Sequence, residues 1–413
     1  MTPPAEHIAV VGAGAAGLAT AIFTRELNPA RTVILLDGAA RPGAKILVSG
    51  GSRCNVTNTE VTADDYWGGK RTIIRRVLRA LPVPSTIAFF ERIGVPLKEE
   101  GGGKLFPRSD RSRDVLDALL RAADDAGVTV SASTRVHAVT AGSGFTLQTS
   151  RGPTEAGAVV LATGGLSLPK TGSDGGGFGI AQSLGHSLVP PTPALAPLML
   201  SNGFHASLSG VAHEAELTVW YDGRAAERLR GSLLWTHFGI SGPAALDASR
   251  HVLRGHLQGR RTALSVSFVP GESFDAVDVR WTARAAARPR TSVRNALAEE
   301  LPASVADALV AHAGIASATL LADFSRTDRR RLAHALTALP LSVTGSRGYD
   351  YAEATAGGVP LEEIDPSTME SRKCPSLFLV GEMLDVDGRI GGFNFQWAWS
   401  SGRAAAEGIS RRR

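Results

Sequence analysis

The chain has 413 residues, of which 43% are hydrophobic and 20% are charged, a composition typical of a globular protein of two or three domains. The arginines behind the net charge of +5 are scattered, and no nucleic-acid-binding motif accompanies them, which disfavours nucleic acid as a partner. The two cysteines, Cys54 and Cys374, form no C-x-x-C pair, so the sequence offers neither a dithiol redox centre nor a zinc site.

The start of the chain bears on its location in the cell. No basic segment precedes the first apolar run, as a signal peptide would require. That run, residues 8–22, contains three glycines and is shorter than the ~20 residues of a membrane span. Together with the low cysteine content, this predicts a cytoplasmic protein without a membrane span and without a bound metal.

The first motif is a dinucleotide-binding fingerprint. A β-rich run at Ile8–Val11 leads directly into Gly12-Ala-Gly14-Ala-Ala-Gly17. Helix formers fill Leu18–Leu27, and a second apolar run, Thr32–Leu36, ends in Asp37. This order of strand, glycine turn, helix, strand and acid predicts a Rossmann-type unit.

Each residue of this fingerprint has a physical task. Gly12 allows the tight turn, Gly14 lets a pyrophosphate approach the backbone, and Gly17 lets the helix lie close to the strand. The helix N-terminus offers N–H groups and positive partial charge to the phosphates, while Asp37 can accept hydrogen bonds from a ribose diol. We therefore assign cofactor contacts to Gly12, Gly14, Ala15, Ala16, Gly17, Asp37 and Gly38.

A second segment rich in glycine and small polar residues follows the second strand, at residues 43–58. Such a loop can wrap around a pyrophosphate and reach a ring system, and Lys45 and Arg53 can offset phosphate charge. The alternative is an ordinary surface loop. The cofactor-binding candidates in this loop are Lys45, Ser49, Gly50, Gly51, Arg53, Cys54 and Asn55.

This loop resembles the G-x-K-x-x-x-S-G-G-G-R-C-N-x-T-N motif of a family of bacterial flavoproteins that are often named aminoacetone-oxidase-like, or NAD(P)/FAD-dependent oxidoreductases. The chain departs from the motif only at Ser52, where the family usually has glycine. Further segments are similar to family motifs, and they cover most of the chain: 104–109, 161–165, 171–177, 231–243 and 355–359.

The resemblance implies FAD as the cofactor and names further contacts. The turn at Thr163, Gly164 and Gly165 approaches the cofactor in many FAD enzymes, and Val136 resembles the backbone site that meets adenine. Near the C-terminus, a predicted strand at Leu377–Val380 precedes an acidic and glycine-rich segment and a helix from about Trp397 to Ile409. The resemblance implies cofactor contacts there by Gly381, Glu382, Asp387, Gly391, Gly392, Phe393 and Asn394.

The pattern of elements predicts an α/β fold in which both chain ends build one Rossmann-like (GR2-type) FAD-binding domain. Residues 1–190 form its first part, and the proline-rich stretch at 190–193 marks the exit. Residues 191–342 form an inserted substrate or cap domain, β-rich and then helical, and residues 343–413 complete the FAD-binding domain. No second fingerprint appears, so NAD(P)H is expected only as a transient electron donor.

Few residues present themselves for chemistry on the substrate. Arg53 and Arg108 could hold an anionic or carbonyl substrate, and Thr355 could face the flavin ring. For Arg53, a structural role in the loop is an equal alternative. Cys54 has no His–Asp arrangement nearby, so a small buried residue is the better interpretation than a nucleophile.

These features predict an FAD-dependent oxidoreductase that transfers a hydride between flavin N5 and a small organic molecule. The resemblance suggests two substrate classes: amines oxidised with O₂, or conjugated carbonyl compounds reduced with NAD(P)H. The alternatives are an FAD-binding protein that modifies RNA or associates with nucleic acid, and a flavin-binding protein without turnover. An arginine-rich face beside the flavin would favour RNA, whereas scattered arginines favour a small substrate.

Overall fold

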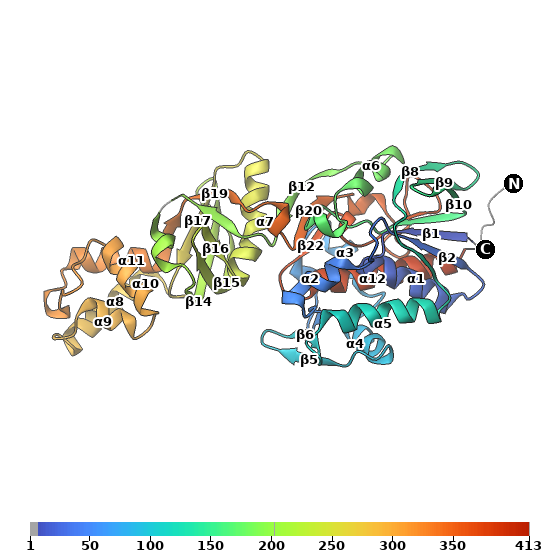
Figure 1. The fold of residues 1–413 in the computed structure, drawn as a ribbon. Coiled ribbons are helices and arrows are strands. Elements are labelled where there is room, and N and C mark those ends of the chain that lie inside the picture. Colours follow the sequence, from blue (N-terminus) through green and yellow to red (C-terminus); the bar gives the residue numbers. More distant parts are fainter. Residues whose placement is uncertain (1–6, 202, 413) are drawn as a thin grey trace. The chain divides into compact units, whose positions relative to one another are not determined.

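The computed structural model describes residues 7–201 and 203–412. The chain divides into two compact units (Figure 1). The nucleotide-binding unit comprises Met1–Thr192 and Glu353–Arg413, and the insert comprises Pro193–Ala352. Both ends of the chain therefore contribute to the first unit.

A five-stranded parallel sheet forms the centre of the nucleotide-binding unit, in the order β21-β11-β1-β2-β7. Its central strand is buried along nearly its whole length, as expected for a parallel sheet that is covered on both faces. The strands are β1 (His7–Val11), β2 (Thr32–Leu36), β7 (Thr129–Ser131), β11 (Ala158–Leu161) and β21 (Leu377–Leu379).

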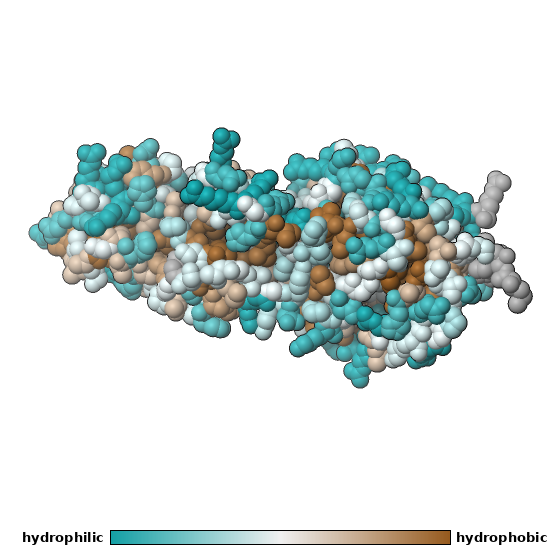
Figure 2. Space-filling view, turned by 90° about the horizontal axis from the view of Figure 1, so that it is seen from above, coloured by the Kyte–Doolittle hydropathy of each residue, from teal (hydrophilic) through white to brown (hydrophobic). Residues whose placement is uncertain are grey.

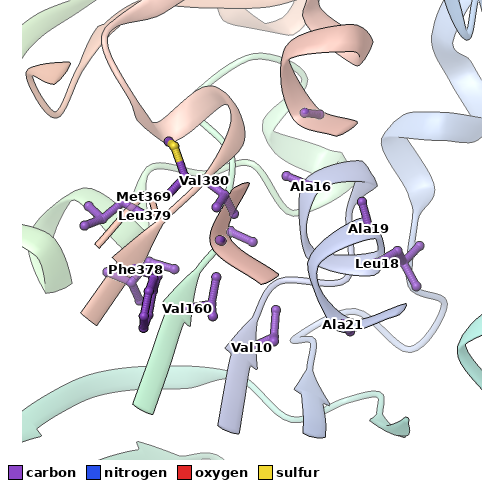
Figure 3. Close-up of a cluster of buried hydrophobic side chains, with 14 of the residues drawn as sticks. Val10, Ala16, Leu18, Ala19, Ala21, Val160, Met369, Phe378, Leu379 and Val380 are labelled. Atoms are coloured by element: carbon purple, nitrogen blue, oxygen red, sulfur yellow. The ribbon is translucent and has the colours of Figure 1, made fainter. Parts of the chain in front are cut away.

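Helix α1 (Ala15–Leu27) packs along α12 (Phe393–Ser410), although the two lie at opposite ends of the sequence. Gly402 allows this close approach, because a Cβ there would lie 3.0 Å from the carbonyl oxygen of Ala16. Figure 3 shows side chains of α1 and of strands β1, β11 and β21 in one apolar core, with Val10, Val160 and Phe378 among them. The core thus ties the two chain ends together.

Smaller elements surround this sheet in the same unit. Three antiparallel strands, β8 to β10, form a separate sheet, and β5, β6 and β3 form another. The pairs β4–β22 and β12–β20 join segments from the two ends of the chain. The bounds are α2 (Ala44–Ser52), β3 (Thr57–Asn58), β4 (Tyr66–Gly68), α3 (Arg71–Leu78), α4 (Val83–Arg92), β5 (Leu97–Glu100), β6 (Lys104–Pro107), α5 (Ser112–Asp125), β8 (Val136–Ala141), β9 (Phe145–Thr149), β10 (Gly152–Ala156), α6 (Gly176–Ser183), β12 (Val189–Ala194), β20 (Ala354–Gly358) and β22 (Val386–Gly388).

The insert has its own core, built on a seven-stranded sheet in the order β18-β17-β14-β15-β16-β13-β19. Asp222 and Gly223 both have positive φ and form the two-residue turn of its longest hairpin, a sequence that suits such turns. The elements are β13 (Leu198–Leu200), β14 (Ala212–Tyr221), β15 (Arg224–Thr236), β16 (Gly239–Ser241), α7 (Pro243–Leu257), β17 (Thr262–Ser267), α8 (Phe274–Ala287), α9 (Val293–Ala298), α10 (Ala303–His312), α11 (Arg326–Ala338), β18 (Leu339–Leu341) and β19 (Val343–Ser346).

The structure corrects three details of the sequence interpretation. The chain returns to the nucleotide-binding unit at Glu353 rather than at Val343, because β19 pairs with β13 inside the insert. The proline-rich stretch marks the exit from the first unit after Thr192, as expected, but it is strand β12, paired with β20, rather than a break in the regular structure. Residues 44–52 of the second glycine-rich loop are kinked helix rather than loop. The role of the insert as a cap on the cofactor stays a prediction.

In the face drawn in Figure 2, hydrophilic residues cover much of the surface of each unit, and apolar residues show among the hydrophilic ones in smaller areas. Among the helices of the described residues, none combines the length and apolar character needed to cross a membrane.

Candidate functional site

The turn after β1 is fixed by close backbone packing. Gly12 has a φ of 103°, and a Cβ there would lie 2.5 Å from the carbonyl oxygen of Ala162. A Cβ on Gly17 would overlap the carbonyl oxygen of Gly12. At Gly14, by contrast, no heavy atom of the described residues lies within 4 Å of the Cβ position. The backbone of Gly14, which leads into α1, is therefore open to a ligand.

Asp37 stands directly after β2, beside this turn. Its Oδ2 accepts a hydrogen bond from the backbone N of Ala13 (2.7 Å), and its Oδ1 accepts one from Ala39 (2.8 Å). These two bonds orient the carboxylate toward the glycine turn and leave further lone pairs on its oxygens. Asp37 can therefore also accept hydrogen bonds from a ribose diol.

Strand β11 lies on the other side of β1 from β2, so the turn after β11 flanks the glycine turn on the side opposite Asp37. The hydroxyl of Thr163 is buried and has no hydrogen-bond partner within the described residues. A buried polar group without a partner is costly, and a ligand can satisfy it. Gly164 has a φ of 73°, and Gly165 lies against Thr355, which leaves no room for a side chain at Gly165.

Thr355, which we expected to face the flavin, is completely buried. Its hydroxyl oxygen accepts hydrogen bonds from the backbone N of Leu166 (2.8 Å) and of Ser167 (3.1 Å). The side chain thus supports the turn after β11, and its predicted contact with the ring stays untested.

The second glycine-rich segment takes its shape from left-handed backbone. Helix α2 is interrupted at Ser49, Gly50 and Gly51, and both glycines have positive φ. Ser52 has a φ of 66° and Cys54 a φ of 62°, a region that non-glycine residues rarely adopt. This explains why the related motif has glycine at position 52. The left-handed conformation is retained here with serine.

Lys45, at the start of α2, is paired inside the unit. Its ammonium forms an ion pair with Glu382 and a hydrogen bond with the hydroxyl of Ser167. Ser167 in turn donates to Oε1 of Glu382 (2.8 Å). Lys45, Ser167 and Glu382, which we call the polar cluster, join three segments that lie far apart in the sequence. Lys45 therefore already has a counter-ion, whereas we expected its charge to offset a phosphate.

Arg53, at the other end of the same loop, is directed to the β5–β6 hairpin. Its Nη1 lies 2.9 Å from Oε1 of Glu100 and 3.5 Å from Oδ1 of Asp110, and its guanidinium stacks 4.1 Å above the ring centre of Phe106. These contacts support the structural interpretation of Arg53. Arg108 is exposed and donates to the carbonyl of Leu97 (3.3 Å), so the structure does not bring it to the polar cluster.

Cys54 follows Arg53 in the chain and is completely buried. Burial raises the pKa of its thiol to about 12, and a hydrogen bond with Ser49 only partly counteracts this. The thiol is therefore protonated at neutral pH and is a poor nucleophile. The geometry agrees with a packing role.

The C-terminal segment is held to the second loop by hydrogen bonds. With its amide nitrogen facing the carbonyls of Leu105 and Thr57, Asn55 accepts from the backbone N of Gly392 (3.1 Å). Gly392 has a φ of 95° and precedes α12, and a Cβ there would lie 2.5 Å from the backbone of Thr57. Asn394 exchanges two hydrogen bonds with the backbone of Gly388. The N-terminus of α12 is thereby fixed in place.

The remaining predicted contacts are distributed over the same unit. Ala15 and Ala16 begin α1, Gly38 follows Asp37, Val136 begins β8, and Gly381 has a φ of 72°. Asp387 is buried in β22, and Phe393 begins α12. Gly391 accepts a hydrogen bond from the side chain of Asn58 (3.1 Å).

These features fit FAD. The open backbone at Gly14 stands at the N-terminus of α1, where a pyrophosphate is stabilised. Asp37 stands beside the glycine turn with lone pairs that a ribose diol could use, and Thr163 has a buried hydroxyl without a partner among the described residues. A second helix N-terminus, that of α12, suits the negative charge of a reduced flavin. The fold and the site therefore define an FAD-dependent oxidoreductase with a Rossmann-type domain.

Comparisons with known proteins extend this assignment. Residues 6–408 match the HI0933-like protein Rossmann domain, and the chain belongs to this family. It is 31% identical to a 3-dehydro-bile acid Δ(4,6)-reductase of Clostridium scindens, over 97% of this chain and 99% of the relative. It is 32% identical to a ribosomal RNA dihydrouridine synthase of Escherichia coli, over 97% of both chains. A mutant of E. coli quinol fumarate reductase FrdA shares the fold, with a TM-score of 0.53 at 17% identity, covering 98% of this chain and 69% of that one.

Some residues of the site gave no signal in the sequence. Ser167 is a lone serine after the Thr163–Gly165 turn, and only its three-dimensional contacts reveal its part in the polar cluster. Gln396 bonds to Thr57 (2.6 Å) and to the carbonyl of Leu81 (2.7 Å), which fixes α12 against the second loop. A buried glutamine in a helix otherwise rich in apolar and small residues is the one pattern that could have indicated it.

Proposed function

We propose that this protein uses FAD to reduce a carbon–carbon double bond that is conjugated to a carbonyl group. The observation that carries the proposal is the similarity, over nearly the whole chain, to two relatives whose names describe one type of bond. A Δ4,6 double-bond system next to a 3-keto group is a conjugated dienone, and dihydrouridine is uridine saturated next to its C4 carbonyl. A shared fold and site would then serve a shared chemistry on different substrates.

Bound FAD would supply the hydride through N5, with NAD(P)H as the proposed source of the electron pair. The role of the chain's own residues is to bind the FAD and to stabilise charge on its ring. Asp37, the open backbone at Gly14 and the N-terminus of α1 would bind the adenosine and pyrophosphate portion. The N-terminus of α12 would stabilise negative charge on the pyrimidine side of the ring. In this proposal the polar cluster binds the ribityl region through Glu382, while Lys45 balances the charge of that carboxylate.

Two other activities remain candidates, each with its own motivation. Oxidation of an amine with O₂ follows from the aminoacetone-oxidase-like motif of the second loop. Reduction of a uracil within RNA follows from the ribosomal RNA dihydrouridine synthases of E. coli and Haemophilus influenzae, 32% and 30% identical. Against RNA, many arginines of the insert are neutralised: Arg280, Arg284 and Arg294 each pair with a carboxylate. We therefore favour a small conjugated carbonyl compound.

One anaerobic experiment separates these candidates. The purified protein is denatured to identify the released flavin, and a second sample is titrated with NADH and NADPH. We expect FAD and bleaching of the visible spectrum by one of the two nucleotides. The reduced protein is then mixed with a 4-en-3-one steroid, a 4,6-dien-3-one steroid, or uridine-containing ribosomal RNA. Reoxidation by a steroid supports the proposal, and reoxidation by RNA alone replaces the substrate class. Bleaching by aminoacetone but by neither nucleotide would contradict it.

A further inference from the structure

An ion pair lies beside the proposed adenosine site without having a part in the fingerprint. Nη1 of Arg135 lies 2.7 Å from Oδ2 of Asp174, and both side chains are partly exposed. Arg135 stands between β7 and β8, and Asp174 precedes α6. The pair therefore joins two segments that the sequence separates by about forty residues.

The backbone of Arg135 is fixed on both sides. Its N donates to the hydroxyl of Ser150 (3.0 Å), and its carbonyl accepts from the N of Ser150 (2.8 Å). The side chain starts next to Gly38, where a Cβ would lie 3.3 Å from Cβ of Arg135. Because Gly38 follows Asp37, the arginine begins directly beside the carboxylate proposed to bind the ribose.

Asp174, the acidic partner of the ion pair, is held at the start of α6. Oδ1 of Asp174 accepts from the backbone N of Gly176 (3.0 Å), the first residue of α6. Gly177 is pressed against Thr163, so closely that a Cβ on Gly177 would overlap the threonine side chain. Asp174 is thus attached to a helix that rests on the turn after β11, next to the unsatisfied hydroxyl.

The order of the strands shows where this ion pair lies relative to the glycine turn. Strands β1 and β2 lie between β11 and β7, and all four run parallel, so their carboxyl ends share one edge. Arg135 follows β7 and Asp174 follows β11. The Arg135 side chain starts beside Gly38, after β2, and Asp174 precedes the helix that packs on Thr163, after β11. Because β1 lies between β2 and β11, the ion pair connects the two sides of the glycine turn that follows β1. A dinucleotide bound at this turn would lie next to the ion pair.

We propose that Arg135 and Asp174 form a clasp over the adenosine half of FAD and slow its release. The inference rests on the proposed function in that FAD is the ligand. Partly exposed ion pairs contribute little to the stability of a folded protein, so the pair is not needed to hold the unit together. A planar guanidinium, however, can stack on or hydrogen-bond to an adenine ring, and the ring shields it from water. The clasp is therefore a positioning device for the cofactor.

The test is the rate of FAD release, measured as the rise in flavin fluorescence after dilution of the holoprotein. We expect Arg135→Ala and Asp174→Asn each to speed release about twofold to fivefold, the range of exposed ion-pair energies. The double variant should be no faster than the faster single variant. The exchange variant, with Arg135→Asp and Asp174→Arg together, should recover part of the slow release. Asp174→Asn keeps an oxygen for Gly176, so α6 retains its start.

Arg151→Ala is the matched control, because Arg151 is exposed near Arg135 and its side chain donates a long hydrogen bond to the carbonyl of Ser133 (3.4 Å). It should leave the release rate unchanged. An unchanged rate in Arg135→Ala and Asp174→Asn would overturn the clasp, as would an equal acceleration by Arg151→Ala. Unchanged release together with a lowered thermal midpoint of the apoprotein would assign the pair a structural role instead. A wild-type protein without FAD would contradict the proposed function itself, which is a different outcome.

Discussion

The turn at Gly12–Gly17 and the loop at residues 43–58 are both rich in glycine, but they obtain their shape in different ways. At Gly12 and Gly17 of the turn, backbone atoms of Ala162 and of Gly12 leave no room for a side chain. In the loop, the backbone is left-handed even at Ser52 and Cys54, and distant polar partners hold the ends. Lys45 reaches Glu382, and Asn55 reaches Gly392.

Glycine is therefore required for a different physical reason in the turn and in the loop. In the turn, Gly12 and Gly17 are needed because another backbone atom occupies or crowds the Cβ position. In the loop, the conformation costs a non-glycine residue about 1 kcal/mol or more, and the surrounding contacts sustain it. Substitution of Gly12 or Gly17 should therefore damage the fold, whereas the loop should respond mainly to the loss of its partners.

The largest effect is expected from Gly17→Ala. The new Cβ would overlap the carbonyl oxygen of Gly12, so α1 must shift away from β1. We expect a loss of about 1–3 kcal/mol in the free energy of unfolding, together with loss of FAD, measured by urea denaturation and by flavin content.

Gly14→Ala is the matched control for that variant, since the Cβ position at Gly14 is open. Its apoprotein should unfold at the wild-type urea concentration, while its FAD affinity falls. If the two apoproteins were equally stable, the steric difference between Gly17 and Gly14 would have no effect on the fold, and our explanation of the turn would be wrong.

The next effect concerns the polar cluster. Glu382→Ala removes the counter-ion of a partly buried Lys45 and leaves Ser167 as its remaining partner in the cluster. We expect a double-mutant cycle with Lys45→Ala to give a coupling of about 0.5–3 kcal/mol in the free energy of unfolding. A coupling near zero would show that the loop does not depend on this long-range contact.

Arg53→Ala should have a smaller effect than either change in the polar cluster. Its ion pairs with Glu100 and Asp110 are about one-third exposed, and such pairs contribute about 0–1 kcal/mol. The variant should therefore keep its FAD and nearly all of its stability. Loss of turnover at full FAD content would instead establish the catalytic role, and loss of FAD would establish phosphate binding.

The smallest effect is expected at Cys54. Because burial raises its pKa to about 12, the thiol should not react with iodoacetamide at pH 7.5 in the folded protein. A Cys374→Ser variant leaves Cys54 as the one thiol that mass spectrometry can detect. Labelling should appear only after unfolding, and labelling of the folded chain would restore the nucleophile hypothesis.

The same contrast explains how much the sequence reveals. The segment from β1 to Asp37 can be predicted because the whole motif lies within about thirty residues, and its elements match the prediction closely. The ion-pair partners of Lys45 and Arg53 cannot be predicted from the sequence, because each cation has many possible counter-ions along the chain. The return at Glu353 was missed for a similar reason, since residues 343–346 look like any short strand and only pairing with β13 assigns them to the insert.

The pairing of the two chain ends has a consequence for synthesis. On the ribosome β1, α1 and β11 emerge before the insert, but β21 and α12, which complete their sheet and core, emerge after it. Until then the side of α1 that packs against α12 has no partner, whereas the strands of the insert sheet all lie between Leu198 and Ser346 and are already complete in sequence. The nascent chain should therefore depend on chaperones late in translation. A stop codon that removes only α12 should be as damaging as the loss of a much larger segment.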